Sequence, residues 1–187
     1  MKAVFAVCGS FCNHAQSIKA LEALVSEGHD LYPVISEISA STDTRFGTCE
    51  SLKLRVGTLC GREPIYTIRD AEQMLTPQKF DALVICPCTG NTLAKISCGI
   101  TDSVVSMSAK IAFRNRVPVV IALATNDALG MTLRNIAEAA VRKGVYFVPL
   151  RQDSPKKKPD SLICEFDMLR QTLECAADGV QIQPVLL

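Results

Sequence analysis

Short, continuously apolar runs alternate with amphipathic helical patterns along this chain. The apolar runs predict strands at residues 2–8, 31–35, 82–86, 119–124 and 145–148. Between the first two runs, four apolar residues recur at helical spacing and a glycine follows them: Ile18, Leu21, Leu24, Val25 and Gly28. Because a strand that is apolar at every position is buried on both faces, this alternation predicts one α/β domain with a parallel, flavodoxin-like sheet covered by helices.

Weaker patterns complete the predicted order of elements. Helices are expected at residues 52–59, 91–98, 104–114, 133–141 and 167–177, with a helical turn at 70–74. Residues 64–68 are expected to form a short additional strand, and residues 36–47 and 151–161 are expected to be loops. In the helix over 133–141, the predicted buried face consists of Leu133, Ile136, Ala137, Ala140 and Val141.

The length and charge of the chain exclude several classes of protein. Its 187 residues correspond to about one domain of roughly 150 residues. Lys and Arg number 20 against 19 Asp and Glu, a balance that argues against a nucleic-acid-binding protein, which needs a basic excess. The longest apolar run, Val117 to Ala124, is far shorter than the roughly 20 residues of a membrane span. The amino terminus lacks the apolar core of a signal peptide. We therefore expect a cytoplasmic protein without membrane or nucleic-acid partners.

The nine cysteines have two interpretations. An odd count argues against a disulfide framework, and no Cys-x-x-Cys pair indicates a metal site. The closest spacings are Cys8 with Cys12 and Cys86 with Cys88, both near predicted strand ends, so an iron–sulfur or zinc cluster assembled in space is the alternative. We favour reduced thiols that behave as small buried apolar residues, and expect no metal.

Polar clusters follow three of the predicted strands. They are Gly9-Ser10, Thr89-Gly90-Asn91-Thr92 and Thr125-Asn126. In doubly wound sheets, ligands bind beyond the carboxyl ends of the strands, and free N–H groups at a helix start favour a phosphate. Ordinary turns and helix caps could account for single clusters, and Thr101-Asp102-Ser103 has capping of the next helix as its simplest interpretation. Three polar clusters after three strands predict a ligand site at this edge of the sheet.

Charged residues offer further candidates. Arg45 lies in a polar segment and suits a carboxylate, although a surface ion pair with Asp43 or Glu50 is an equal alternative. Residues 156–158 are three consecutive lysines within the predicted basic loop at 151–161, which would be either solvated or a mobile cover over an anionic substrate. Of the two histidines, His14 follows the first polar cluster and His29 is expected to be exposed and inert.

Several short motifs resemble those of the flavin-dependent flavoproteins, a family that includes cysteine decarboxylases and prenyl-flavin synthases. They are Gly9-Ser10 and the run Pro87-x-Thr-x-Asn-Thr-Leu-Ala-Lys-Ile. Within that family the chain is similar to the B subunits of dipicolinate synthases over residues 4–185. This closer resemblance depends on Thr44-Arg45-Phe46-Gly47, Thr89-Gly90-Asn91, Thr101-Asp102-Ser103, Arg114-Asn115, Thr125-Asn126-Asp127-Ala128-Leu129-Gly130 and Gln152-Asp153-x-Pro-x-Lys-Lys-Pro159.

The resemblance implies a Rossmann-like, three-layer fold that binds FMN. The implied cofactor residues are Gly9, Ser10, Ser36, Thr89, Asn91 and Thr92, to which the strand-end clusters add Gly90, Thr125 and Asn126. Arg45 and Lys157 are the expected substrate-binding residues, and no catalytic residue is assigned.

The same resemblance implies a function and partners. The function would be the oxidation of dihydrodipicolinate to dipicolinate during sporulation, by an oxidoreductase that acts together with an A subunit and forms a homo-oligomer. The alternative is a non-catalytic structural or activating subunit for an A subunit that carries NADP. A flavin-dependent decarboxylase is disfavoured, because the family's histidine is absent from residues 36–47 and its Pro-Ala-Met-Asn motif appears only as Ala124-Thr125-Asn126.

Overall fold

Five parallel strands form the centre of the molecule. The computed structural model describes residues 1–187. The strands are β1 (Lys2–Val7), β2 (Asp30–Ile35), β3 (Ala82–Cys88), β4 (Val119–Thr125) and β5 (Val145–Phe147). They lie in the order β2-β1-β3-β4-β5, and β3 is buried at all seven positions. This order and burial confirm the predicted α/β fold, since a strand that helices cover on both faces must be apolar throughout.

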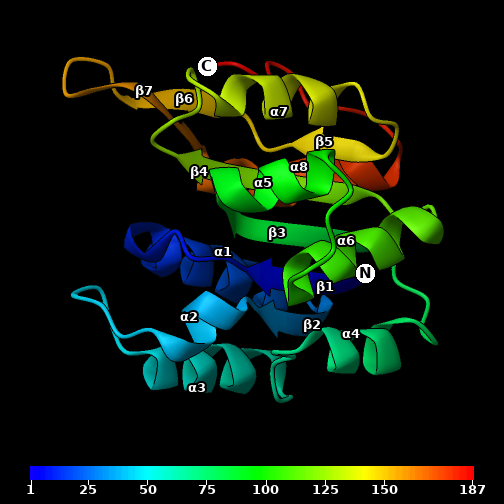
Figure 1. The fold of residues 1–187 in the computed structure, drawn as a ribbon. Helices are drawn as coiled ribbons and strands as arrows, with labels where there is room; N and C mark the ends of the chain where they lie inside the picture. The colour runs from blue at the N-terminus through cyan, green and yellow to red at the C-terminus, as the bar shows by residue number, and fades with distance from the viewer.

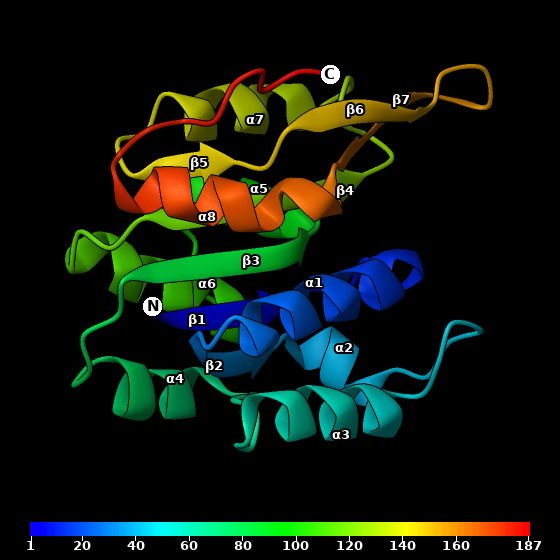
Figure 2. The same cartoon turned by 180° about the vertical axis from the view of Figure 1, so that it is seen from behind.

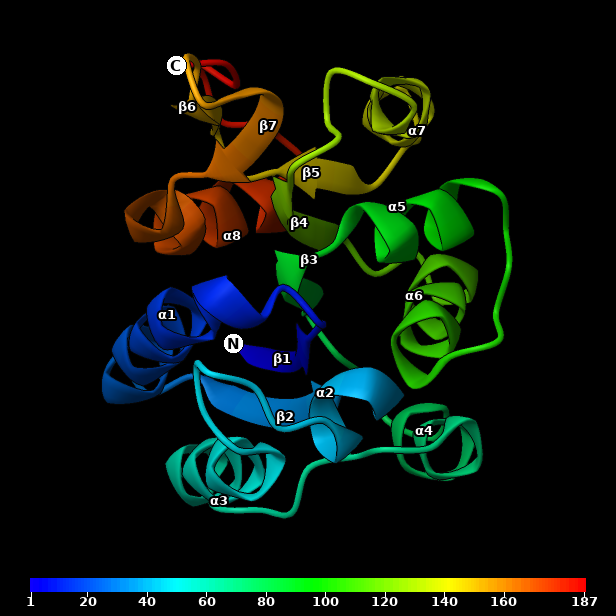
Figure 3. The ribbon, with the colours of Figure 1, turned by 60° about the vertical axis from the view of Figure 1, so that its left-hand side comes forward.

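Helices cover both faces of the sheet. On one face lie α5 (Gly90–Ser97), α6 (Val104–Arg114) and α7 (Thr132–Ala140), as Figure 1 shows. On the other lie α1 (His14–Ser26) and α8 (Leu169–Ala177), seen in front of the sheet in Figure 2. The end-on view separates the three layers and places α3 (Cys49–Cys60) beside β2 and α4 (Ile68–Leu75) beside α6 (Figure 3). Two single-turn 3₁₀ helices, η1 (Phe11–Asn13) and η2 (Phe166–Met168), precede α1 and α8.

The segments around β2 differ from two predictions. The expected loop at residues 36–47 begins with the short helix α2 (Glu37–Ser41), because the Ser36 side chain accepts a hydrogen bond from the Ser39 N–H and caps it. The expected strand at residues 64–68 is a single bridge between Ile65 and Val34. Thr67 then caps α4, so the chain turns into a helix before a second pair of residues can join the sheet.

The predicted basic loop at residues 151–161 is instead part of a β-hairpin. Its strands, β6 (Leu150–Ser154) and β7 (Lys158–Cys164), are antiparallel, and β7 pairs with the carboxyl end of β4 through Ala124 and Thr125. The sheet is therefore mixed, with β5 beside the first half of β4 and β7 beside its end. The hairpin and the loop after α2 project from the same end of the sheet (Figure 1).

The predicted buried face of α7 is wrong except at Ile136, which is half-buried against the core. Leu133 is 47% exposed and Val141 is 85% exposed, whereas Thr132 and Ala139 are buried. α7 packs mainly against α5, and this contact uses a face that carries few large apolar residues. The spacing therefore identified the helix and its period, but not the side that faces its neighbour.

None of the helices combines the length and the apolar character needed to cross a membrane.

Candidate functional site

A cleft of about 750 Å³ lies at the carboxyl ends of β1, β3 and β4. Three walls enclose it: the β1–α1 turn, the start of α5, and the end of β4 together with β7. Seven of the nine predicted cofactor residues line it: Gly9, Ser10, Thr89, Gly90, Asn91, Thr125 and Asn126. The strand order produces this convergence, because the carboxyl ends of neighbouring parallel strands meet at one edge.

The β1–α1 turn forms the first wall and is held by local hydrogen bonds. The Asn13 amide Nδ2 donates to Ser10 Oγ at 2.8 Å, and the Asn13 N–H donates to the Ser10 carbonyl at 2.9 Å. His14 Nε2 lies 2.8 Å from the carbonyl oxygen of Cys8. The imidazole itself lines a separate hollow beside α3, and burial lowers its pKa. His14 thus stabilises the turn through this contact and does not line the cleft.

The amino terminus of α5 forms the second wall. The Thr89 side chain caps the helix by accepting a hydrogen bond from the Thr92 N–H at 3.1 Å. The N–H groups of Gly90 and Asn91 belong to the first turn of a helix, where no intrahelical partner exists, and they are suited to an anion. A Cβ at Gly90 would lie 2.8 Å from Thr125 Oγ1, so the absence of a side chain allows α5 to approach β4 this closely.

The hairpin contributes the third wall, which the sequence interpretation missed. Ser161 Oγ donates to the carbonyl oxygen of Thr125 at 3.3 Å, which ties β7 to the end of β4. Lys158 Nζ lies 2.6 Å from Asp153 Oδ2, and both side chains line the cleft. The apolar residues that follow Ser161 were the available signal that this segment enters the sheet.

Two predicted cofactor residues lie outside the cleft lining. Ser36 is buried as the cap of α2. Thr92 is only 8% exposed; its hydroxyl accepts from Thr89 Oγ1 at 3.0 Å and donates to Cys8 Sγ at 3.4 Å. Both side chains support the elements that carry the cleft.

The two predicted substrate residues are exposed near the cleft without lining it. Arg45 stacks on Phe46 with its guanidinium carbon 4.9 Å from the ring centroid, and Phe46 lines the cleft. The ion pairs considered for Arg45 do not form: Asp43 accepts a hydrogen bond from the Cys49 N–H, and Glu50 pairs with Lys53. Lys157 lies at the exposed turn of the hairpin, and its neighbour Lys158 reaches the cleft instead.

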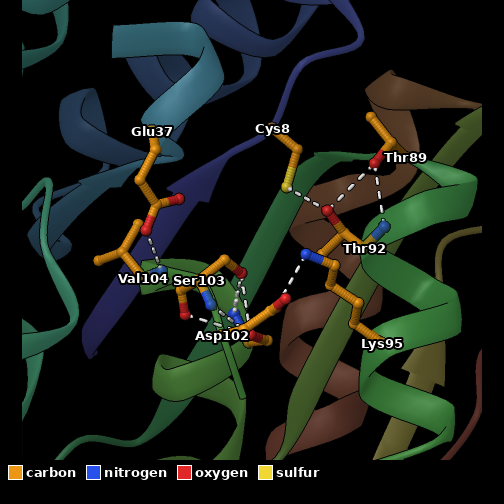
Figure 4. Close-up of polar contacts among 9 residues, drawn as sticks. Cys8, Glu37, Thr89, Thr92, Lys95, Asp102, Ser103 and Val104 are labelled. Atoms are coloured by element: carbon orange, nitrogen blue, oxygen red, sulfur yellow. Dashed lines mark hydrogen bonds and ion pairs between the residues drawn. The ribbon is translucent and has the colours of Figure 1, made fainter. Parts of the chain in front are cut away.

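A polar network beside the cleft fixes the starts of α5 and α6 (Figure 4). Ser103 caps α6 in a capping box with Ser106, which confirms the capping interpretation of this motif. The carboxylate of Glu37 accepts from the Val104 N–H at 2.6 Å and so links α2 to α6. Lys95 lies 2.8 Å from Asp102 and lowers the pKa of that carboxyl. These contacts hold α2, α5 and α6 in fixed positions around the strand ends.

The cysteines near the site form no disulfide bonds. Burial raises the pKa of Cys8 to about 11 and that of Cys86 to about 12, so both thiols stay protonated at neutral pH. Cys12 is exposed and lines the cleft. No group of three or more His, Cys, Asp or Glu side chains is arranged to hold a metal ion.

Comparisons with known proteins show the family of the chain. A family model described as Flavoprotein matches residues 1–174. The B subunit of dipicolinate synthase from Bacillus subtilis (strain 168) is 39% identical over 183 residues, which are 98% of this chain and 92% of that protein.

Two solved structures give the same result for the fold. The crystal structure of the dipicolinate synthase B subunit from Bacillus halodurans has a TM-score of 0.90 at 35% identity and covers 100% of this chain and 95% of that one. Burkholderia xenovorans DmrB in complex with FMN has a TM-score of 0.68 at 16% identity, over 92% and 93% of the two chains, and is similar in fold. The chain therefore belongs to the flavoprotein family, as a homologue of the B subunit of dipicolinate synthase.

Proposed function

We propose that this protein is the FMN-binding subunit of a dipicolinate synthase and that it oxidises dihydrodipicolinate together with an A subunit. The observation that carries the proposal is the cleft at the strand ends, which gathers seven of the nine residues expected to bind FMN. The 39% identity to the B subunit of dipicolinate synthase over 98% of the chain supports the same substrate class.

The residues of the cleft are chemically suited to FMN. Its volume of about 750 Å³ lies within the roughly 300–1,000 Å³ of typical ligand pockets. The N–H groups at the start of α5 and the hydroxyl of Ser10 are suitable donors for a phosphate, and Asn91 and Asn126 offer amides to a polar ring edge. When bound, FMN would accept the hydride that the dihydropyridine ring loses as it becomes aromatic, and the accompanying proton would be released to water.

The substrate's two carboxylates need cationic partners. Arg45 is available because its acidic neighbours are engaged elsewhere, and its planar fork can donate two parallel hydrogen bonds to one carboxylate. Lys158 is held in the cleft wall by Asp153, and Lys157 lies next to it on the hairpin turn. Binding a dicarboxylate between Arg45 and the hairpin would place the substrate over the mouth of the cleft.

The test combines cofactor binding with turnover. The purified protein should show the visible absorbance bands of oxidised flavin, or acquire them when titrated with FMN. Riboflavin is the matched control ligand: because the proposed site holds the phosphate, riboflavin should bind at least about tenfold more weakly, a difference of about 1.4 kcal/mol. Dipicolinate formation with the A subunit should then depend on added FMN.

Two results would contradict the proposal in different ways. A protein that binds no flavin yet raises the activity of an NADP-dependent A subunit would be a structural or activating subunit. Equal affinity for FMN and riboflavin would show that the phosphate is not held at the start of α5.

A further inference from the structure

A basic surface lies at the opposite end of the sheet from the cleft. Two adjoining hollows of about 460 and 580 Å³ flank Phe113, which lines both of them. The smaller hollow reaches the carboxyl end of α5, and the larger one includes Pro118 and Gly144, which precede β4 and β5. The two hollows together, here called the basic groove, contain five cationic side chains: Lys110, Arg114, Arg116, Arg142 and Lys143.

The groove combines an apolar floor with a cationic rim. Helical spacing brings Lys110, Phe113 and Arg114 to one side of α6. Ile100, which follows α5, is 47% exposed and lines the same hollow as Lys110 and Arg114. Figure 3 shows the ends of α5, α6 and α7 on the same face of the sheet, and Arg142 follows α7. An aromatic ring and an exposed aliphatic side chain thus lie between positive charges.

The five cations have no acidic partner. None of them forms an ion pair, and no carboxylate lines either hollow. The guanidinium carbon of Arg142 lies 3.7 Å from the centroid of the Phe113 ring, a cation–π contact that orients its donors. Because the net charge of the whole chain is only +1, five unpaired cations at one edge are a local excess of positive charge.

We propose that the basic groove is the docking site for an acidic, amphipathic segment of the A subunit. This inference rests on the proposed function, which requires such a partner. Charge complementarity calls for carboxylates along the rim, and the apolar floor calls for one or two apolar side chains between them, as in the binding of a helix in a groove. The cations are spread over two hollows on either side of Phe113, an arrangement that fits several carboxylates along one peptide segment better than one compact anion. Docking at the amino ends of the strands would leave the cleft open to substrate.

Charge reversal with a matched control tests the docking site. The test variant is Lys110→Glu/Lys143→Glu, since both lysines are exposed and unpaired and one comes from each hollow. The control is Lys19→Glu/Arg69→Glu, which changes the net charge equally at exposed positions on α1 and α4 that line neither hollow. Titration calorimetry with the purified A subunit should show at least tenfold weaker binding for the test variant and near-normal binding for the control. Binding by the parent should weaken as salt is added.

The outcomes separate this inference from the proposed function. FMN titration of the same variants checks that the cleft and the fold are intact. If the test variant binds the A subunit as tightly as the parent, the docking site is wrong while the proposed function stands. If the parent protein does not bind the A subunit, both are wrong. If Lys110→Glu/Lys143→Glu instead lowers the mass of the protein alone in sedimentation, the groove is an interface between copies of this chain and the inference is overturned.

Discussion

Adding a single methyl group at Gly90 should disturb both the stability and the ligand affinity of the protein. The Cβ of Gly90→Ala would lie 2.8 Å from Thr125 Oγ1 and 3.0 Å from Thr132 Oγ1, whereas ordinary contacts begin near 3.4 Å. Neither threonine can move freely. The Asp127 N–H donates to Thr125 Oγ1 at 3.4 Å, and Thr132 Oγ1 donates to Asp127 Oδ2 at 3.3 Å. The new methyl group must therefore displace α5 or the turn that contains Asp127.

The expected cost follows from overpacking. Forcing one methyl group into a closely packed contact typically lowers the free energy of unfolding by about 1–3 kcal/mol. The better helix propensity of alanine offsets only part of this cost, because Gly90 is the first residue of α5. For a chain of this size, each 1 kcal/mol lowers Tm by about 2–4 °C, so the expected decrease is between about 2 and 12 °C. Since Gly90 and Thr125 both line the cleft, affinity for FMN should also decrease, by about tenfold.

A double-mutant cycle identifies the clashing atom. Thr125→Ala removes the oxygen at 2.8 Å, so Gly90→Ala/Thr125→Ala should be more stable than the sum of the single changes predicts, by about 0.5–3 kcal/mol. Thermal unfolding and FMN titration of the four proteins provide the measurements. A Gly90→Ala protein with unchanged Tm and unchanged FMN affinity would refute the reasoning, and so would strict additivity of the two changes.

Three further predictions concern individual side chains. Asn91→Ala should lower FMN affinity by about 1–3 kcal/mol through the loss of a hydrogen bond to the ligand, without changing Tm, because Thr89 already caps α5; a change in Tm alone would contradict this role. Arg45→Lys should raise KM for dipicolinate formation with the A subunit while Tm stays constant. Unchanged kinetics would show that Arg45 does not bind the substrate. Burial lowers the pKa of His14 in the folded protein, so the unfolded chain binds a proton more readily and stability decreases as pH falls below about 6.5. In His14→Gln an amide can still donate to the Cys8 carbonyl, but no group at this position titrates. The Tm of this variant should therefore decrease less than that of the parent between about pH 7.5 and pH 5.5. An equal decrease would show that His14 is not the source of the pH dependence.

Local sequence patterns were sufficient for most of the fold. The apolar runs at 82–86 and 119–124 became central strands, because strands covered by helices on both sides must be apolar at every position. The helix predicted at 104–114 has the predicted bounds. The clusters after β1, β3 and β4 converged on one cleft, because these parallel strands are neighbours in the sheet and their carboxyl ends share an edge.

Only the tertiary structure decided which side chains face one another. Ser36 and Thr92 look like ligand contacts in the sequence, yet each is buried as a cap or a link between elements. The polar stretch at 151–161 looks like a loop, but Leu162 and Ile163 pair with the end of β4 and draw the segment into the sheet. Leu133 and Val141 match the helical period of α7 yet are exposed. Each of these outcomes depends on contacts between residues far apart in the chain, whereas local spacing determines only the type of element and its period.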